Sequence, residues 1–200
     1  MRFLASVARA AWWTAARARP PLPREAGLLT PHAHRARVSP LDLDANLHVN
    51  NASLLLMTEL ARWRMLAESG SLAEAWRRRW VFMVGGQAVR YRHEMTLGEP
   101  YAVHTELLAR DAAWFWFRHR VVVPGEGPRA AAAAAGEGGG DKCAAQVLVR
   151  IIIKRGRDTV APEDAMRAVG VDASRVPTPD QVPQIAAFLA WDAAVKREMG

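Results

Sequence analysis

The feature that most constrains this chain is a segment of strong helix formers from Asn51 to Ser69, which contains neither glycine nor proline. Gly70 follows the segment and is a typical helix stop. Apolar side chains cover more than one narrow stripe of such a helix, so we expect it to be buried on most sides. The sequence therefore predicts a fold that surrounds one long helix.

Four runs rich in β-branched and aromatic residues follow this helix and predict strands, at residues 80–94, 100–111, 113–124 and 146–156. No helical pattern lies between them, so the sheet is expected to be antiparallel with meander-like connections. The short segment 34–38 predicts a first edge strand. Together these segments predict an α+β domain in which five or six antiparallel strands wrap around the central helix.

Size and composition agree with one folded domain. The chain has 200 residues, of which 50% are hydrophobic, and this suffices for a core. No apolar run reaches the roughly 18 residues of a transmembrane helix. The single Cys143 excludes an intrachain disulfide framework and fits a reducing compartment.

Three parts are expected along the chain: a basic amphipathic arm at 1–31, a globular domain at 32–176 and an amphipathic helix at 177–200. A low-complexity stretch of glycine and alanine at 124–142 predicts a loop insertion without chemistry. The C-terminal helix is expected to turn three apolar side chains inward: Phe188, Leu189 and Trp191.

Much of the formal charge of +7 lies near the N-terminus, where residues 1–40 hold seven arginines and one acidic residue, Glu25. A nucleic-acid-binding domain would carry its basic residues on the folded face, so no nucleic-acid partner is expected. Arginines beside Trp12 and Trp13 suit a mitochondrial transit peptide, a helix on an anionic membrane surface, or a helix docked on its own domain. These alternatives leave the mitochondrial matrix and the cytoplasm, with or without membrane contact, as candidate locations.

Three polar residues, Asp44, Asn46 and His48, alternate just before the long helix. In an extended segment they would converge on one face. Asn50 or Asn51 would cap the helix and place its N-terminal dipole beside them. An acid, an amide and an imidazole beside an oxyanion-binding helix terminus predict a hydrolase site. The alternative is that these side chains only bond local backbone in a turn.

Residues 39–62 resemble the signature of hotdog-fold acyl thioesterases, in which a DxNxHxNN motif precedes the long central helix. The motif is similar to that of plant acyl-acyl carrier protein thioesterases and of proteins of the thioesterase superfamily member 6 kind. The resemblance covers residues 34–157. It implies a hotdog fold and hydrolysis of an acyl-CoA or acyl carrier protein (ACP) thioester. It also implies a homodimer or higher homo-oligomer with the active site at a subunit interface, and no metal or cofactor.

Carried over to this sequence, the resemblance implies that Asp44 is the general base or nucleophile and that Asn46 and His48 orient it, the water or the substrate. Glu94, in the sequence YRHEM, matches a glutamate of the plant enzymes. Met95 stands at their cysteine position, which excludes a thiol nucleophile there.

Glu59, about two turns into the helix, is a rival base, because some hotdog thioesterases use a helix carboxylate. A carboxylate in an apolar helix needs a buried partner, such as Arg62 or Arg90. An alternative function is a catalytically weak acyl-thioester-binding or membrane-associated scaffold protein. No G-x-S-x-G, H-E-x-x-H or C-x-x-C motif supports a serine-triad, zinc or dithiol site.

Arg77, Arg78 and Arg79 lie between Trp76 and Trp80. A run of charges is usually a solvated face. The other interpretation is that these arginines meet the phosphates of coenzyme A or the acidic face of a carrier protein.

Overall fold

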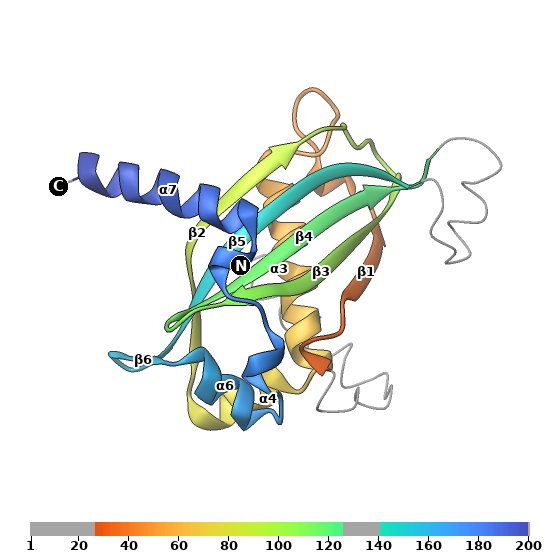
Figure 1. The fold of residues 1–200 in the computed structure, drawn as a ribbon. Coiled ribbons are helices and arrows are strands. Elements are labelled where there is room, and N and C mark those ends of the chain that lie inside the picture. The colour runs from red at the N-terminus through yellow and green to blue at the C-terminus, as the bar shows by residue number, and fades with distance from the viewer. Residues whose placement is uncertain (1–26, 126–140, 200) are drawn as a thin grey trace.

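The computed structural model describes residues 27–125 and 141–199, and within them an antiparallel sheet curls around one helix (Figure 1). The strands are β1 (His32–Arg37), β2 (Val81–Tyr91), β3 (Pro100–Arg110), β4 (Trp114–Val123), β5 (Lys142–Arg155) and β6 (Asp158–Val160). The helices are α3 (Asn51–Glu68), α4 (Ser71–Arg78), α6 (Pro162–Ala168) and α7 (Pro183–Glu198), with short 3₁₀ turns η1 (Pro40–Asp42), η2 (Ala173–Arg175) and η3 (Pro179–Gln181). The predicted α+β architecture is confirmed.

Helix α3 forms where the sequence predicts it, because a side-chain cap begins it and a glycine follows it. Asn50 is the N-cap, and its Oδ1 accepts a hydrogen bond from the backbone N–H of Ala52 at 2.8 Å. Gly70, with φ of 77°, lies just after the C-cap of α3 and is itself the N-cap of α4. Only Asn51 and Ala52 of α3 are exposed, so the expected burial on most sides is confirmed.

The strand order is β1-β3-β4-β5-β2, with β6 paired to β5, and all pairs are antiparallel. The predicted meander is right for β3, β4 and β5. It is wrong for β2, which pairs with the far side of β5, so the chain crosses the sheet from β2 at one edge to β3, which lies next to the opposite edge strand β1. Among the described residues, β1 and β2 are therefore the two edges of the main sheet.

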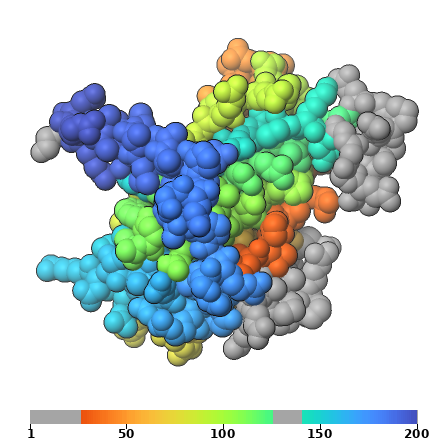
Figure 2. Space-filling view, viewed as in Figure 1, coloured from red at the N-terminus to blue at the C-terminus, as the bar shows by residue number. Residues whose placement is uncertain are grey.

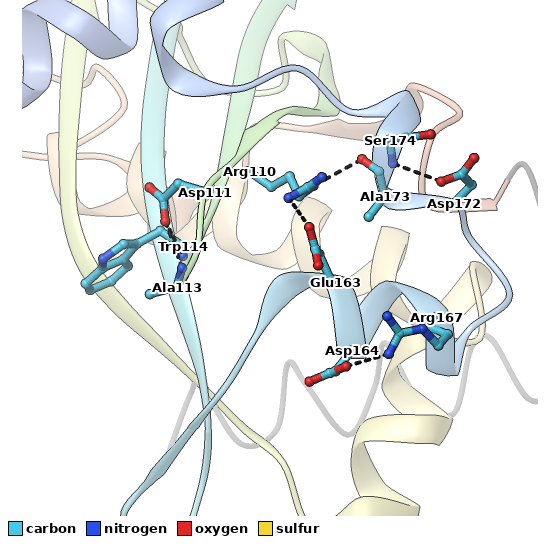
Figure 3. A network of polar contacts seen from close by, with 10 residues as sticks. All are labelled: Arg110, Asp111, Ala113, Trp114, Glu163, Asp164, Arg167, Asp172, Ala173 and Ser174. Atoms are coloured by element: carbon cyan, nitrogen blue, oxygen red, sulfur yellow. Dashed lines mark hydrogen bonds and ion pairs between the residues drawn. The ribbon is translucent and has the colours of Figure 1, made fainter.

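The segment after the sheet is tied to the β3–β4 turn by Arg110 (Figure 3). Its Nη1 lies 2.8 Å from Oε1 of Glu163 in α6, and its Nε donates to the carbonyl of Ala173 at 3.0 Å. In the turn itself, Oδ1 of Asp111 accepts hydrogen bonds from the backbone N–H groups of Ala113 and Trp114 (Figure 3). The sequence did not predict α4 or α6, which close the end of the molecule beyond the C-terminus of α3 (Figure 1).

Helix α7 packs on the outer face of the sheet mainly through its first half, and Asp192, just past its middle, forms an ion pair with Arg150 of β5. Ile185 and Phe188 are buried against Trp116 and neighbouring apolar residues. Leu189 is 37% exposed and Trp191 is 56% exposed, so the prediction that both face inward is wrong. The C-terminal end of α7 stands away from the body of the molecule, as Figures 1 and 2 show.

Most of the N-terminal arm, up to residue 26, and most of the insertion, 126–140, lie outside the described residues. The expectations about both segments therefore stay predictions. Within the part of the chain that the structure describes, no helix is both long and apolar enough to cross a membrane.

Candidate active site

The polar motif before α3 forms a tight loop. The backbone N–H of Asp44 bonds the carbonyl of His48 at 2.9 Å, and that of Leu47 bonds the carbonyl of Asp44 at 3.1 Å. Leu47 has φ of 61°, in the left-handed region. The prediction that Asp44, Asn46 and His48 share one face of an extended segment is therefore wrong, because the turn breaks the two-residue alternation.

The return limb of this loop docks on the segment that follows β2. The N–H of Val49 bonds the carbonyl of Met95 at 2.9 Å, and His48 forms an isolated β-bridge with Thr96. This pairing places Nε2 of His48 3.2 Å from Oε2 of Glu94. Two predicted site residues that are far apart in the sequence thus meet at the N-terminus of α3.

A pocket of about 220 Å³ lies beside this pair. It is lined by His48 and Val49 of the loop, Asn51 and Leu54 of α3, and the segment Tyr91–Met95 at the end of β2. Because the first turn of a helix has N–H groups without helical acceptors, the start of α3 gives this pocket a positive electrostatic end. The arrangement places an imidazole, a carboxylate and a helix N-terminus around a space open to solvent.

The other two motif residues do not line this pocket. Oδ1 of Asp44 accepts a hydrogen bond from the backbone N–H of Asn46 at 2.8 Å, so this oxygen is engaged in a local turn. Asn46 is exposed near the tip of the loop. Asp44 itself is half-buried and is held to His48 through the backbone.

Glu59 lies on α3 away from the pocket lining, at a position where its side chain is 34% exposed. Its Oε1 accepts a hydrogen bond from Nε1 of Trp63 at 3.4 Å and lies 3.9 Å from Nη2 of Arg62. Of the two partners expected for this carboxylate, the structure therefore provides Arg62.

Beneath α3 lies a buried polar chain that sequence reasoning missed. Nη1 of Arg62 lies 3.1 Å from Nε2 of His119, whose Nδ1 lies 2.9 Å from Oγ1 of Thr105. Burial lowers the pKa of Arg62 to about 10, and burial together with Arg62 lowers the pKa of His119 well below 6.5. Thr105 and His119 are directly opposite in the β3–β4 register. The signal in the sequence that could have predicted this contact is that both polar residues stand at inward positions of strands that are otherwise apolar.

The described residues contain no cluster of potential metal ligands. Among residues 27–125 and 141–199, no three His, Cys, Asp or Glu side chains lie close enough together to hold a metal ion.

Comparison with known proteins bears on both fold and family. The chain is 30% identical over 96 residues to Protein THEM6 of Xenopus laevis, an alignment that covers 48% of this chain and 46% of that protein. The chain thus spans about half the length of the curated relatives it matches.

Two solved structures share the architecture. The probable thioesterase YbaW of Escherichia coli has a TM-score of 0.57 at 21% identity, covering 69% of this chain and 95% of that one. The protein SAV2348 of Staphylococcus aureus, solved in complex with CoA, has a TM-score of 0.57 at 17% identity, covering 76% and 89%. At these identities the likeness shows the fold alone, which is the predicted hotdog fold.

The family rests on the sequence itself. The pattern of the thioesterase-like superfamily matches residues 38–174, which include the polar loop, α3, all strands from β2 to β6 and α6. This match covers more than half of the chain and confirms the resemblance seen in the DxNxHxNN motif. The protein belongs to the thioesterase-like superfamily.

Proposed function

We propose that this protein hydrolyses acyl thioesters, carried by coenzyme A or by ACP, in the pocket at the N-terminus of α3. The observation that carries the proposal is the His48–Glu94 pair, which lies in a pocket beside the N-terminus of α3. Membership of the thioesterase-like superfamily supports thioester hydrolysis, and the CoA bound to SAV2348 supports a CoA-linked substrate.

The reaction needs a base and an oxyanion site. Water attacks the thioester carbonyl carbon while the base takes one of its protons. The N–H groups at the start of α3 stabilise the negative charge that develops on the carbonyl oxygen. The C–S bond then breaks, the proton passes from the base to the leaving thiolate, and a carboxylic acid and a free thiol remain.

Asp44 is the base in this proposal, as the motif resemblance implies, with Asn46 and His48 orienting the water or the substrate. A second candidate base is His48 held by Glu94, and the observation that supports it is that both side chains line the pocket whereas Asp44 does not. Glu59 is the third candidate, although its contacts with Trp63 and Arg62 lie elsewhere on α3.

A homodimer is part of the proposal. Strand β2 pairs only with β5 among the described residues, so its other edge is unpaired along eleven residues. Val81, Met83, Val84 and Tyr91 of this strand are 45% to 57% exposed. A long, exposed apolar edge strand is a template for pairing with another chain. Pairing of two β2 edges would continue the sheet from one protomer into its partner.

The deciding experiment measures thiol release from acyl-CoA esters of graded length and from acyl-ACP. Wild-type protein is compared with Asp44→Asn, Glu94→Gln and Glu59→Gln, and with Asp180→Asn as a control on an exposed carboxylate of η3. Loss of the base is expected to lower kcat by about a hundredfold or more, whereas the control stays near wild type. Thioester binding without turnover in the wild-type protein would contradict the proposal and favour an acyl-thioester-binding protein.

A further inference from the structure

A second depression, with a volume of about 490 Å³, lies at the other end of the molecule from the candidate active site. It is formed where the end of α4, the β5–β6 hairpin and α6 meet, at the end of the domain opposite the loop that precedes α3 (Figure 1). Its charged and aromatic lining consists of Arg78, Trp80, Arg155, Asp158, Asp164 and Arg167. We call it the basic groove.

The three arginines of the basic groove differ in their partners. Arg78 is ion-paired with Glu74, and its guanidinium carbon lies 5.3 Å from the centre of the Trp80 ring. Nη1 of Arg167 lies 2.6 Å from Oδ1 of Asp164. Arg155 is exposed and forms no ion pair with any described residue. Its planar guanidinium is therefore available to bind a phosphate through two parallel hydrogen bonds.

The surroundings of the basic groove add further positive charge. Arg77 and Arg79 at the end of α4, and Arg157 in the β5–β6 turn, are exposed around it. The carboxylates of Asp158 and Asp164, and that of Glu74, which is ion-paired with Arg77 and Arg78, offset only part of this charge. Such a surface raises the local concentration of polyanions and speeds their association.

Within one protomer the basic groove is too distant to serve the candidate active site. Trp80 immediately precedes β2, whereas Tyr91 and Glu94 of the pocket lie at the end of β2. The strand has eleven residues, which corresponds to roughly 36 Å at the usual rise per residue. A single extended pantetheine arm does not cover that distance.

Pairing of two β2 edges would remove this difficulty. Two copies of one strand that are related by a two-fold axis run antiparallel, so the start of one β2 lies beside the end of the other. In such a dimer the basic groove of each protomer would lie next to the pocket of its partner. The pocket and the groove would then form one continuous composite site.

We propose that the basic groove binds the phosphate groups of the coenzyme A half of the thioester, with Arg155 as the main ligand, and that it serves the active site of the partner protomer. The proposal rests on the proposed thioesterase function and on the β2-paired dimer. It assigns Arg155 to substrate binding and not to the chemical step.

The test compares an acyl-CoA with the matching acyl-pantetheine, which has the same acyl group and lacks the nucleotide. Arg155→Glu is compared with Arg35→Glu, which makes the same charge change on an exposed arginine of β1, at the opposite edge of the sheet. Arg155→Glu is expected to raise KM for acyl-CoA at least about tenfold, as the loss of a charge-assisted hydrogen bond does. KM for acyl-pantetheine is expected to change no more than it does in Arg35→Glu.

Binding of CoA itself, measured by calorimetry, separates this proposal from the proposed function. If neither thioester is hydrolysed but Arg155→Glu weakens CoA binding about tenfold relative to Arg35→Glu, the hydrolase proposal fails and the groove assignment stands. Equal effects of the two variants on KM and on CoA affinity would overturn the groove assignment. A defect seen with acyl-ACP and absent with acyl-CoA would also overturn it, in favour of a protein partner.

Mixed dimers test whether the groove acts across the interface. Differently tagged chains carrying Asp44→Asn and Arg155→Glu are co-expressed, and the heterodimer is purified. Its one intact pocket belongs to the Arg155→Glu chain and faces the intact groove of the other chain. A wild-type KM for acyl-CoA is expected. The raised KM of the Arg155→Glu homodimer would show instead that each groove serves its own protomer.

Discussion

Nη1 of Arg62 lies 3.1 Å from Nε2 of His119 in the buried layer between α3 and the sheet. Because arginine only donates hydrogen bonds, Nε2 of His119 must accept, and the ring proton lies on Nδ1 and is donated to the hydroxyl of Thr105. Burial and the charge of Arg62 both lower the pKa of His119, so the imidazole is neutral near pH 7. The helix and two strands are thereby joined by one fixed polar network.

The lowered pKa of His119 predicts a loss of stability in acid. The unfolded chain takes up this proton near the ordinary pKa of about 6.5, whereas the folded protein takes it up only at much lower pH. Stability is therefore complete above the unfolded pKa and declines as pH falls below it, by at most about 1.4 kcal/mol per pH unit for this group. Urea unfolding of wild type and His119→Gln across that range should show a shallower decline in the variant, whereas exposed His93→Gln should keep the wild-type slope.

The Arg62–His119 contact predicts coupled effects on stability. Arg62→Leu leaves a buried acceptor on His119 without its donor, which is expected to cost about 1–3 kcal/mol. The double variant Arg62→Leu, His119→Leu removes both partners and should cost less than the sum of the single changes. Denaturant unfolding of all four proteins measures this coupling, and strictly additive losses would show that the contact contributes nothing.

The close approach of Trp114 to Gly85 predicts that a larger residue at position 85 would clash on the outer face of the sheet. A Cβ at this position would overlap the ring of Trp114, which in turn lies over the guanidinium of Arg150. Gly85→Ala is therefore expected to destabilise the protein by about 1–3 kcal/mol through overpacking. In a Trp114→Ala background the same change should cost much less. Thermal unfolding of wild type and the three variants tests this, and an equal cost in both backgrounds would show that the ring is not the cause.

The unpaired edge of β2 predicts the quaternary structure. Val84 is 48% exposed on this edge strand, so Val84→Lys is expected to place a charge in the dimer interface and to shift the protein toward monomer. Leu41→Lys changes a residue that is 69% exposed in η1 and serves as the control. Sedimentation velocity distinguishes the species, and a Val84→Lys protein that dimerises like wild type would remove β2 from the interface.

Local sequence was enough to predict the long helix and the main strands of the domain. Helix α3 agrees with its sequence from cap to stop because Asn50, the uninterrupted helix formers and Gly70 each act on the backbone within a few residues of their own position. Strands β2 to β5 likewise follow local β-branched and aromatic runs. Helices α4 and α6 are short and were missed, since isolated helices of that length are marginal and depend on tertiary packing.

The sequence by itself determined that an acid, an amide and an imidazole would precede a capped helix, and its DxNxHxNN motif identified the superfamily. Only the tertiary structure decided which of these side chains meet in a pocket. The positive φ of Leu47 turns the loop, and the bridge between His48 and Thr96 brings Glu94 into contact with the imidazole. The position of β2 at the far edge was likewise decided by strand pairing across long sequence separations, which no local pattern specifies.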